Sequence, residues 1–386
     1  MSPHAMPLPR VLPALLALVA PVVLAGPAAA APPEQVRVAT FNASLNRAAE
    51  GELVADLSTP DDPQAREVAE VVQRVRPDVL LVNEFDHDPA AVDLFRDNYL
   101  ERGQNGAEPI EYPHAFTAPV NTGVPSGFDL DNDGTVGGGN DALGFGEFPG
   151  QYGMLVLSRF PIDTAAARTF QHFLWKDLPG ARLPEGFYSP EELAALPLSS
   201  KSHWDVPVRI GERTLHVLAA HPTPPTFDGP EDRNGLRNAD EIAFWRHYVQ
   251  PGRDADALYD DAGGRGGLGG GERFVILGDH NSDPFDGDSV PGAAQQLLTA
   301  HRVQDPAPGS DGAAEAANAG HEGDPRLDTA DFAEPEPGNL RVDYVLPSRP
   351  LDVLSSGVFW PVAADPLARL NDVSDHHATW VDLRVR

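Results

Sequence analysis

A carboxylate and a carboxamide follow a short apolar run late in the chain, and side by side they can hold a water molecule and a phosphate oxygen for attack. Residues 274–277 read Phe-Val-Ile-Leu, the pattern of a buried strand, and Pro284 stops that strand soon afterwards. Asp279 and Asn281 lie between them. Alternation along the strand predicts both side chains on one face at its exit. A pair of this kind is suited to the attack of water on a phosphoester.

Polar side chains stand at or beside the ends of five further predicted strands. They are Asn42, Glu84, His221, Asp343, and the pair Asp375 and His376. Strands that form one sandwich can bring such residues to one rim. Phosphoester hydrolysis needs a cation to neutralise developing charge, an aligned nucleophile and help for the leaving oxygen. Hard oxygen ligands suit Mg²⁺, Mn²⁺ or Ca²⁺, and the absence of cysteine argues against structural zinc.

The elements that must position these residues begin as strand–helix–strand and continue as strand pairs. Apolar periodicity predicts strands over residues 35–41, 78–85, 151–160, 203–210, 213–220, 274–279, 341–346, 351–360 and 377–385. Asp62-Pro63 and Asp88-Pro89 each combine an N-cap with a proline at the first helical position, and a third helix covers residues 242–249. Because hairpins are frequent, the pattern favours an α/β fold of two packed sheets over a doubly wound parallel sheet.

The segment Gly278-Asp279-His280-Asn281 resembles Gly-Asp-apolar-Asn, the hallmark of the endonuclease/exonuclease/phosphatase superfamily, with His280 as a departure at the apolar position. The terminal Ser-Asp-His motif and the other strand-end residues follow in family order, so the resemblance extends from Val36 to Leu383. It implies the fold of the pancreatic-type DNases, a four-layer α/β sandwich in which helices flank two packed mixed β-sheets. It also implies a metal-dependent phosphoesterase.

The resemblance assigns metal binding to Asn42, Glu84 and Asp375, with Mg²⁺ or Mn²⁺ as the cation and Ca²⁺ as an alternative. Asn42 stands in Thr-Phe-Asn, Glu84 in Leu-Val-Asn-Glu and Asp375 in Ser-Asp-His. Considered singly, Asn42 would be a turn residue and Glu84 a solvated acid at the end of a strand.

The resemblance assigns catalysis to five residues. His221 stabilises the phosphoryl oxygens or protonates the leaving group, Asp279 orients or deprotonates the attacking water, and Asn281 holds the phosphate. Asp343, in Arg-Val-Asp-Tyr-Val-Leu, fixes the tautomer of His376, which acts as base or transition-state stabiliser. A lone histidine at position 221 would more often be a surface residue.

A second cation site is predicted in a Gly-rich insertion. Asp129, Asp131 and Asp133, followed by Gly134, match the first half of a calcium loop. The twelfth position is Asn140 instead of glutamate, and no helices flank the loop, so it is not an EF-hand. A calcium-stabilised loop and a plain acidic turn are both open at this point.

Residues 1–31 have the pattern of a secretory signal, with an apolar core over residues 11–24 and small residues at 28–30. An N-terminal membrane anchor is the alternative. Residues 34–386 then form one catalytic domain with insertions near 119–150, 254–271 and 305–339, and we expect a secreted monomer without a stable membrane partner.

A formal net charge of −30 disfavours tight nonspecific binding of nucleic acid, although bound cations can reverse the local field. The leading prediction is a secreted phosphoesterase that hydrolyses small or soluble phosphomonoesters or phosphodiesters by activated-water attack. An extracellular nuclease is the alternative, and a sphingomyelinase-like role is weaker because no amphipathic stretch announces membrane docking. A hypothesis from a different functional class is a binding module that has kept the fold but lost turnover.

Overall fold

Two β-sheets pack face to face through the apolar sides of their strands. The computed structural model describes Met1 and residues 34–385, so the predicted secretory segment beyond Met1 lies outside the described residues. The first sheet has the order β12-β13-β1-β2-β4-β3 and the second has the order β11-β8-β7-β6-β5. Each sheet is mixed, because β1 and β2 are parallel in the first, β7 and β8 are parallel in the second, and the other pairs are antiparallel.

The bounds of the strands define the two sheets and one small hairpin. The first sheet contains β1 (Glu34–Leu45), β2 (Val79–Phe85), β3 (His114–Phe116), β4 (Met154–Ser158), β12 (Asp352–Val358) and β13 (Thr379–Val385). The second contains β5 (Arg168–Thr169), β6 (His203–Ile210), β7 (Arg213–Ala220), β8 (Arg273–Asp279) and β11 (Asp343–Pro347). A separate two-stranded unit pairs β9 (Ala330–Asp331) with β10 (Asn339–Leu340).

Helices cover the outer face of each sheet. The α-helices are α1 (Glu52–Leu57), α2 (Pro63–Val75), α3 (Pro89–Phe95), α4 (Pro190–Leu193), α5 (Arg233–Val249), α6 (Arg253–Ala257), α7 (Gln295–Leu298) and α8 (Asp311–Glu315). A π-helical turn spans Arg96–Leu100, and short 3₁₀ helices span Gly139–Asp141, Trp175–Asp177, Pro325–Leu327 and Pro366–Val373. No helix in residues 34–385 is long and apolar enough to cross a bilayer.

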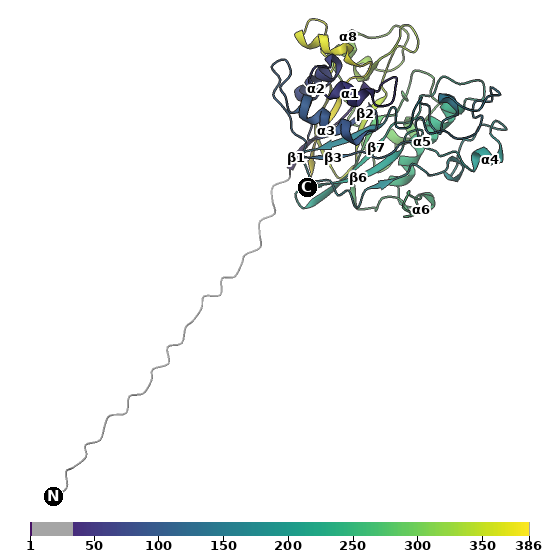
Figure 1. The fold of residues 1–386 in the computed structure, drawn as a ribbon, viewed down its shortest axis with the longest axis horizontal. Helices are drawn as coiled ribbons and strands as arrows, with labels where there is room; N and C mark the ends of the chain where they lie inside the picture. The colour runs from purple at the N-terminus through teal and green to yellow at the C-terminus, as the bar shows by residue number, and fades with distance from the viewer. Residues whose placement is uncertain (2–33, 386) are drawn as a thin grey trace. The chain divides into compact units, whose positions relative to one another are not determined.

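Three apolar clusters separate the layers. One lies between the sheets and joins residues such as Val38 and Leu81 of the first sheet to Val217 and Val275 of the second. A second cluster joins the first sheet to α1, α2 and α3, and a third joins the second sheet to α5 and α7. In Figure 1, α1–α3 lie together on one side of the strands and α5 on the other. The predicted four-layer α/β sandwich is therefore confirmed.

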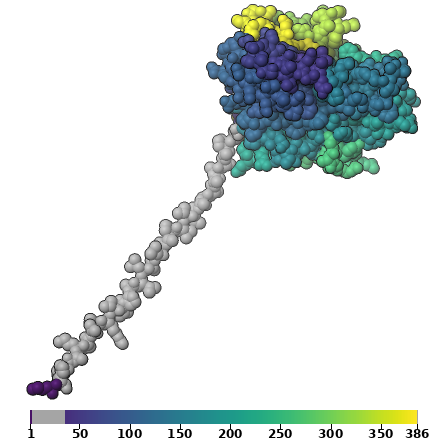
Figure 2. All heavy atoms as spheres, viewed as in Figure 1, coloured from purple at the N-terminus to yellow at the C-terminus, as the bar shows by residue number. Residues whose placement is uncertain are grey.

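The first helices and the end of the chain lie against each other on the surface. Arg369, in the 3₁₀ helix Pro366–Val373, places Nη2 2.6 Å from Oε1 of Glu70 on α2. Figure 2 shows the C-terminal segment, in yellow, directly beside the N-terminal helices, in purple and blue. This closure brings the segment that carries Asp375 and His376 next to the first sheet.

The predicted strand over residues 151–160 is shorter in the structure, as β4, and the one over 351–360 is shorter as β12. At three other strand ends, hydrogen bonds outside the ladder redirect the chain. β1 continues past Asn42 to Leu45, with an irregularity in its pairing to β2 after Asn42. β11 begins at Asp343 because the amides just before it donate to the side chains of Asp283 and Thr329. β13 begins only at Thr379, since the preceding residues bridge to β9.

Candidate active site

Side chains from both sheets meet at the carboxylate of Asp279, the last residue of β8. Its Oδ2 accepts a hydrogen bond from Nδ2 of Asn42 on β1, at 3.1 Å. Nε2 of His221, which follows β7 directly, lies 3.2 Å from the same oxygen. Both Asp279 and His221 are buried. One contact across the two sheets thus joins Asn42 and Asp279, which are 237 positions apart in the chain.

Asn281 reaches Asp279 by a turn and not by strand alternation. The strand ends at Asp279, and Asn281 has a φ of 51°, in the left-handed region. Its amide N donates to Oδ1 of Asp279 at 2.8 Å, an Asx turn that folds the chain back. Nδ2 of Asn281 then lies 3.3 Å from Oδ2 of Asp279 and donates to the carbonyl of Pro222 at 3.1 Å. Asp279 and Asn281 thus lie together as predicted. A turn brings them together, so the prediction that they alternate along one strand was wrong.

The imidazole of His376 is held between two carboxylates. Its Nδ1 donates to Oδ2 of Asp343 at 2.9 Å, and its Nε2 lies 3.6 Å from Oδ2 of Asp279. Oγ1 of Thr329 donates to the same oxygen of Asp343 at 2.9 Å. The ring of Phe332 packs edge-on against the imidazole, with centroids 5.3 Å apart. His376 therefore has a defined orientation, with Nε2 directed toward Asp279.

The charges of this cluster reinforce one another. Burial alone would lower the pKa of His376, but the carboxylates of Asp343 and Asp279 outweigh it and raise that pKa well above its usual range. Burial alone would raise the pKa of Asp279, but His376 and His221 lower it well below its usual range. His221 has its pKa lowered to about 4 by burial and by Lys201, so it is neutral at pH 7. The resting site thus contains a carboxylate at Asp279 and an imidazolium at His376.

Glu84 occupies a strained position at the end of β2. Its φ is 58°, a left-handed conformation that a residue with a Cβ rarely adopts and that is common at functional sites. Burial raises the pKa of its half-buried carboxyl group, and His376 and a hydrogen bond from Asn42 only partly offset this. A carboxylate that is poorly stabilised by its protein neighbours is a suitable ligand for a hard cation.

Asp375 lies at the exposed edge of the site. Its Oδ1 is 3.5 Å from the hydroxyl oxygens of both Ser44 and Ser374, so no strong partner holds it. Ser44 follows Asn42 by two residues and is also left-handed, with a φ of 48°. Glu84, Asp375 and Asn42 each carry an oxygen donor of the type that suits Mg²⁺, Mn²⁺ or Ca²⁺, and the amide oxygen of Asn42 accepts a hydrogen bond from the amide of Ser44 at 3.2 Å.

A second group of ligating atoms consists of Asp279, Asp343 and His376, whose atoms lie within 4.8 Å of one another. This proximity follows from the hydrogen bond that already joins His376 Nδ1 to Asp343. An imidazole nitrogen that donates a proton to a carboxylate cannot also bind a cation. Nδ1 of His376 is therefore engaged by Asp343, and Nε2 is the ring nitrogen that faces Asp279.

Sequence reasoning missed three buried polar residues at the site. Asn83, beside Glu84, accepts hydrogen bonds from Thr40 Oγ1 and from the amide of Asp279, both at 3.3 Å, and so joins the sheets. Thr329 and Lys201 are the others. The sequence could have indicated Asn83, because an asparagine inside an apolar strand needs a hydrogen-bond partner.

Lys201 lies just before β6, and it is one of only two lysines in the chain. The residue is 6% exposed. Burial lowers its pKa, while the carboxylates of Glu241, Glu84 and Asp279 oppose that effect. A protonated lysine close to Asp279 can bind a phosphoryl oxygen as a point charge.

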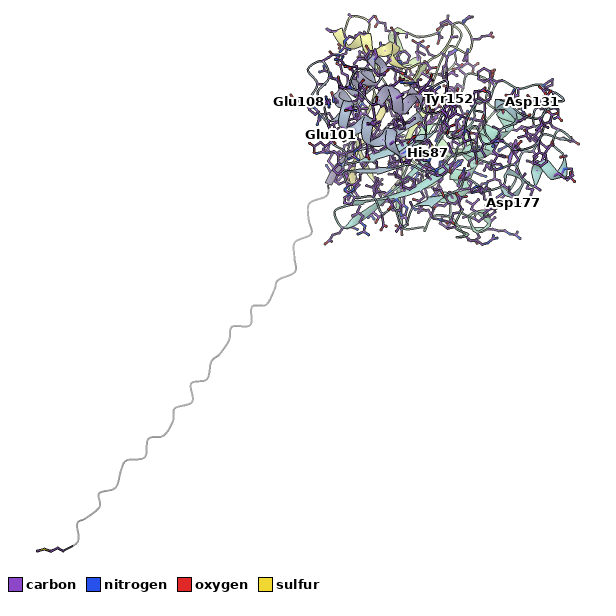
Figure 3. The ribbon with its side chains drawn as sticks, in the orientation of Figure 1. His87, Glu101, Glu108, Asp131, Tyr152 and Asp177 are labelled. Atoms are coloured by element: carbon purple, nitrogen blue, oxygen red, sulfur yellow. The ribbon has the colours of Figure 1, made fainter. Side chains whose placement is uncertain are left out.

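The predicted calcium loop forms a separate acidic cluster. The carboxylate oxygens of Asp129, Asp131 and Asp133 lie within 4.8 Å of one another, whereas Asn140 is exposed. The amide of Asp133 donates to Asp129 at 3.0 Å and to Asp131 at 3.1 Å, which is the pattern of an acidic turn. Tyr152 marks the side of the site that carries Glu84, because its pKa is raised by burial and then by Glu84. Figure 3 places Asp131 at the periphery, away from Tyr152. The loop is not part of the Asp279 site.

Several solved structures are similar to this chain at low sequence identity. A search of curated proteins finds no match. Similar solved structures include an endonuclease/exonuclease/phosphatase protein from Beutenbergia cavernae, with 18% identity, a TM-score of 0.49, and coverage of 91% of this chain and 72% of that one. A family protein from Leptotrichia buccalis has 12% identity, a TM-score of 0.48, and coverage of 90% and 99%. Sphingomyelinase C from Streptomyces griseocarneus has 16% identity, a TM-score of 0.45, and coverage of 90% and 99%.

The model of the Endonuclease/Exonuclease/phosphatase family matches residues 39–376, which include every residue described around Asp279. The match covers most of the 386 residues. The chain therefore belongs to the endonuclease/exonuclease/phosphatase family, whose members are metal-dependent phosphoester hydrolases.

Proposed function

We propose that this protein is a secreted phosphoesterase that acts on small or soluble phosphomonoesters or phosphodiesters. The observation that supports the site most strongly is the set of contacts at Oδ2 of Asp279, where Asn42, His221 and Asn281 meet with His376 nearby. No position of the predicted set carries an inert side chain. A binding module without turnover would not need this arrangement.

The residues have distinct roles in this proposal. Asp279 stays ionised because His376 and His221 lower its pKa, against the effect of burial. Its carboxylate therefore accepts a hydrogen bond from the attacking water and orients it. His376 is an imidazolium because its pKa is raised by Asp343 and Asp279, so it stabilises charge on the phosphoryl oxygens and does not act as the base. Asn281 and His221 complete the phosphate site, and Lys201 adds a cationic contact.

Glu84, Asn42 and Asp375 would hold a divalent cation, Mg²⁺ or Mn²⁺ in our proposal, with Ca²⁺ as the alternative. When bound, the cation supplies neutralisation of the charge that develops on the phosphoryl oxygens. The half-buried Glu84 carboxyl group fits this role because burial raises its pKa, and a bound cation would stabilise the ionised carboxylate.

The preference for soluble phosphoesters rests on charge. A net charge of −30 repels polyanions at long range, which disfavours an extracellular nuclease as the first choice. Secretion is proposed from the apolar N-terminal segment, and residues 34–386 are proposed as the catalytic domain. Analysis of the protein's N-terminus after expression in an exporting host tests this, since cleavage near residue 31 is expected and an intact Met1 would contradict it.

One screen tests the function. The purified mature protein is incubated with p-nitrophenyl phosphate, bis(p-nitrophenyl) phosphate, plasmid DNA, RNA and choline phospholipids, each with Mg²⁺, with Mn²⁺ and with excess chelator. We expect metal-dependent release from a small ester in preference to cleavage of nucleic acid. Preferential cleavage of plasmid DNA would replace our proposal with the nuclease, and the absence of turnover on every substrate would refute the phosphoesterase.

A further inference from the structure

Helix α5 carries a row of buried polar side chains where it passes behind the site. Asn238 is 0% exposed and Glu241 is 1% exposed, although a helix that covers a sheet normally buries apolar residues. A buried carboxylate or amide is strongly destabilising unless hydrogen bonds satisfy it. The partners of these two side chains therefore show why the helix retains them.

Glu241 joins the two segments that carry Lys201 and His221. Its Oε1 accepts hydrogen bonds from the amide of Ser200 at 2.6 Å and from the hydroxyl of Ser200 at 3.0 Å. Its Oε2 accepts from the amide of Thr223 at 2.7 Å. Ser200 precedes Lys201, and Thr223 lies two residues after His221. One carboxylate thus fixes the entry to β6 relative to the exit of β7.

Asn238 joins the exit of β7 to the exit of β8. Its Nδ2 donates to the carbonyl of Thr223 at 2.8 Å and to the carbonyl of His280 at 2.9 Å. His280 lies between Asp279 and Asn281, so this bond holds the left-handed turn that carries both. The residues at these exits lie beyond the strands, where the ladder of β7 and β8 no longer constrains them.

We infer that Glu241 and Asn238 are positioning residues that set the distances between Lys201, His221 and Asp279 from behind the site. The inference rests on the proposed function, since it assigns α5 the task of holding groups that act on a phosphoester. Neither side chain touches the reacting atoms. Their effect is on geometry, and a displacement of about 1 Å in such groups lowers turnover by about 100-fold.

The chain contains a matched control at the next position of the same helix. Asp240 is also fully buried and also accepts three hydrogen bonds, from Trp175 Nε1 at 2.8 Å, from the amide of Arg182 at 2.5 Å and from Nη1 of Arg182 at 2.6 Å. Its partners, Trp175 and Arg182, belong to the segment before α4 and not to the strand exits. Replacing Asp240 by asparagine destabilises the same helix without releasing Ser200 or Thr223.

The test compares Glu241→Gln with Asp240→Asn in the full chain. In each variant the new side-chain NH₂ group faces a hydrogen-bond donor, so at least one hydrogen bond is lost. Both variants should therefore melt at a lower temperature than the wild type. We expect kcat on bis(p-nitrophenyl) phosphate or p-nitrophenyl phosphate to fall about 100-fold in Glu241→Gln with little change in KM, and to change by less than about threefold in Asp240→Asn. Asn238→Leu, which removes both donated bonds, should behave like Glu241→Gln.

Equal loss of kcat in Glu241→Gln and Asp240→Asn, or wild-type kcat in Glu241→Gln, would overturn the inference. Crystal structures of the two variants give a readout that does not depend on turnover. Ser200–Lys201 and Thr223 should move relative to Asp279 in Glu241→Gln and stay in place in Asp240→Asn, and unmoved segments in Glu241→Gln would also overturn it. A wild-type protein that hydrolyses neither ester refutes the proposed function, which is a separate outcome.

Discussion

Nδ1 of His376 lies 2.9 Å from Oδ2 of Asp343, and the two residues are 33 positions apart in the chain. The contact is supported by Thr329, whose hydroxyl donates to the same oxygen at 2.9 Å and accepts from the amides of Val342 and Asp343 at 3.0 Å and 2.9 Å. One side chain from an insertion therefore fixes both the carboxylate and the backbone that carries it. The imidazolium of His376 depends on this arrangement.

Replacing Thr329 by valine should lower kcat by about 10-fold and stability by about 1–3 kcal/mol, because two buried amides lose an acceptor and Asp343 loses a donor. Thr329→Ser keeps the hydroxyl and should restore most of the kcat. Steady-state kinetics and denaturant unfolding of both variants check this. A kcat for Thr329→Val equal to that of Thr329→Ser would show that the hydroxyl does not support the His376–Asp343 pair.

Glu84→Gln should abolish stabilisation by metal. A cation that binds only the folded protein raises its stability by RT ln(1 + [L]/Kd), about 2.7 kcal/mol at 100 times Kd. Addition of Mn²⁺ should therefore raise the Tm of the wild type and leave that of Glu84→Gln unchanged. Thermal melts with and without Mn²⁺ measure this independently of turnover, and an equal rise in both proteins would place the cation elsewhere.

The sequence predicts those parts of the site that depend on contacts between residues close together in the chain. The hairpin of β6 and β7 lies where local alternation places it, and Asp62 caps α2 at its predicted start, with its side chain accepting from the amide of Ala65. The left-handed turn at Asn281 is instead closed by the side chain of Asp279 and the carbonyl of Pro222. Periodicity contains no information on such contacts.

Lys201 and Thr329 show the same limit. Neither belongs to a motif, and each becomes part of the site only because a segment distant in the chain folds over it. The predicted set of strand-end residues could be derived because a shared position at strand exits is a local feature. The residues that hold that set in place act between separate segments of the chain, as Thr329 does for Asp343 at a separation of 14 and Glu241 does for Ser200 at a separation of 41.

His377 should make stability fall in acid between about pH 6.5 and pH 3. Its ring stacks on Trp360 with centroids 3.8 Å apart, and burial, followed by the effect of His376, lowers its pKa from 6.5 to about 3. Below pH 6.5 the unfolded chain takes up a proton at this residue that the folded protein does not, so stability decreases as the pH falls.

His377→Phe keeps an aromatic ring against Trp360 and removes the titration. Each pH unit within that window changes the difference in unfolding free energy between the wild type and this variant by about 1.4 kcal/mol, in favour of the variant as the pH falls. Denaturant unfolding at pH 7, 6 and 5 measures the difference. A difference independent of pH would show that His377 is readily protonated in the folded protein.

The direct test of the active site is the rate of hydrolysis of a small phosphoester by Asp279→Asn and by the wild type, each with Mn²⁺ and with excess chelator. The loss of the carboxylate that orients water and pairs with His376 should lower kcat by at least about 100-fold. Circular dichroism at the assay temperature confirms that the variant is folded. We predict metal-dependent turnover in the wild type and almost none in Asp279→Asn, whereas hydrolysis by a folded Asp279→Asn at the wild-type rate would contradict the assignment of this cluster as the catalytic centre.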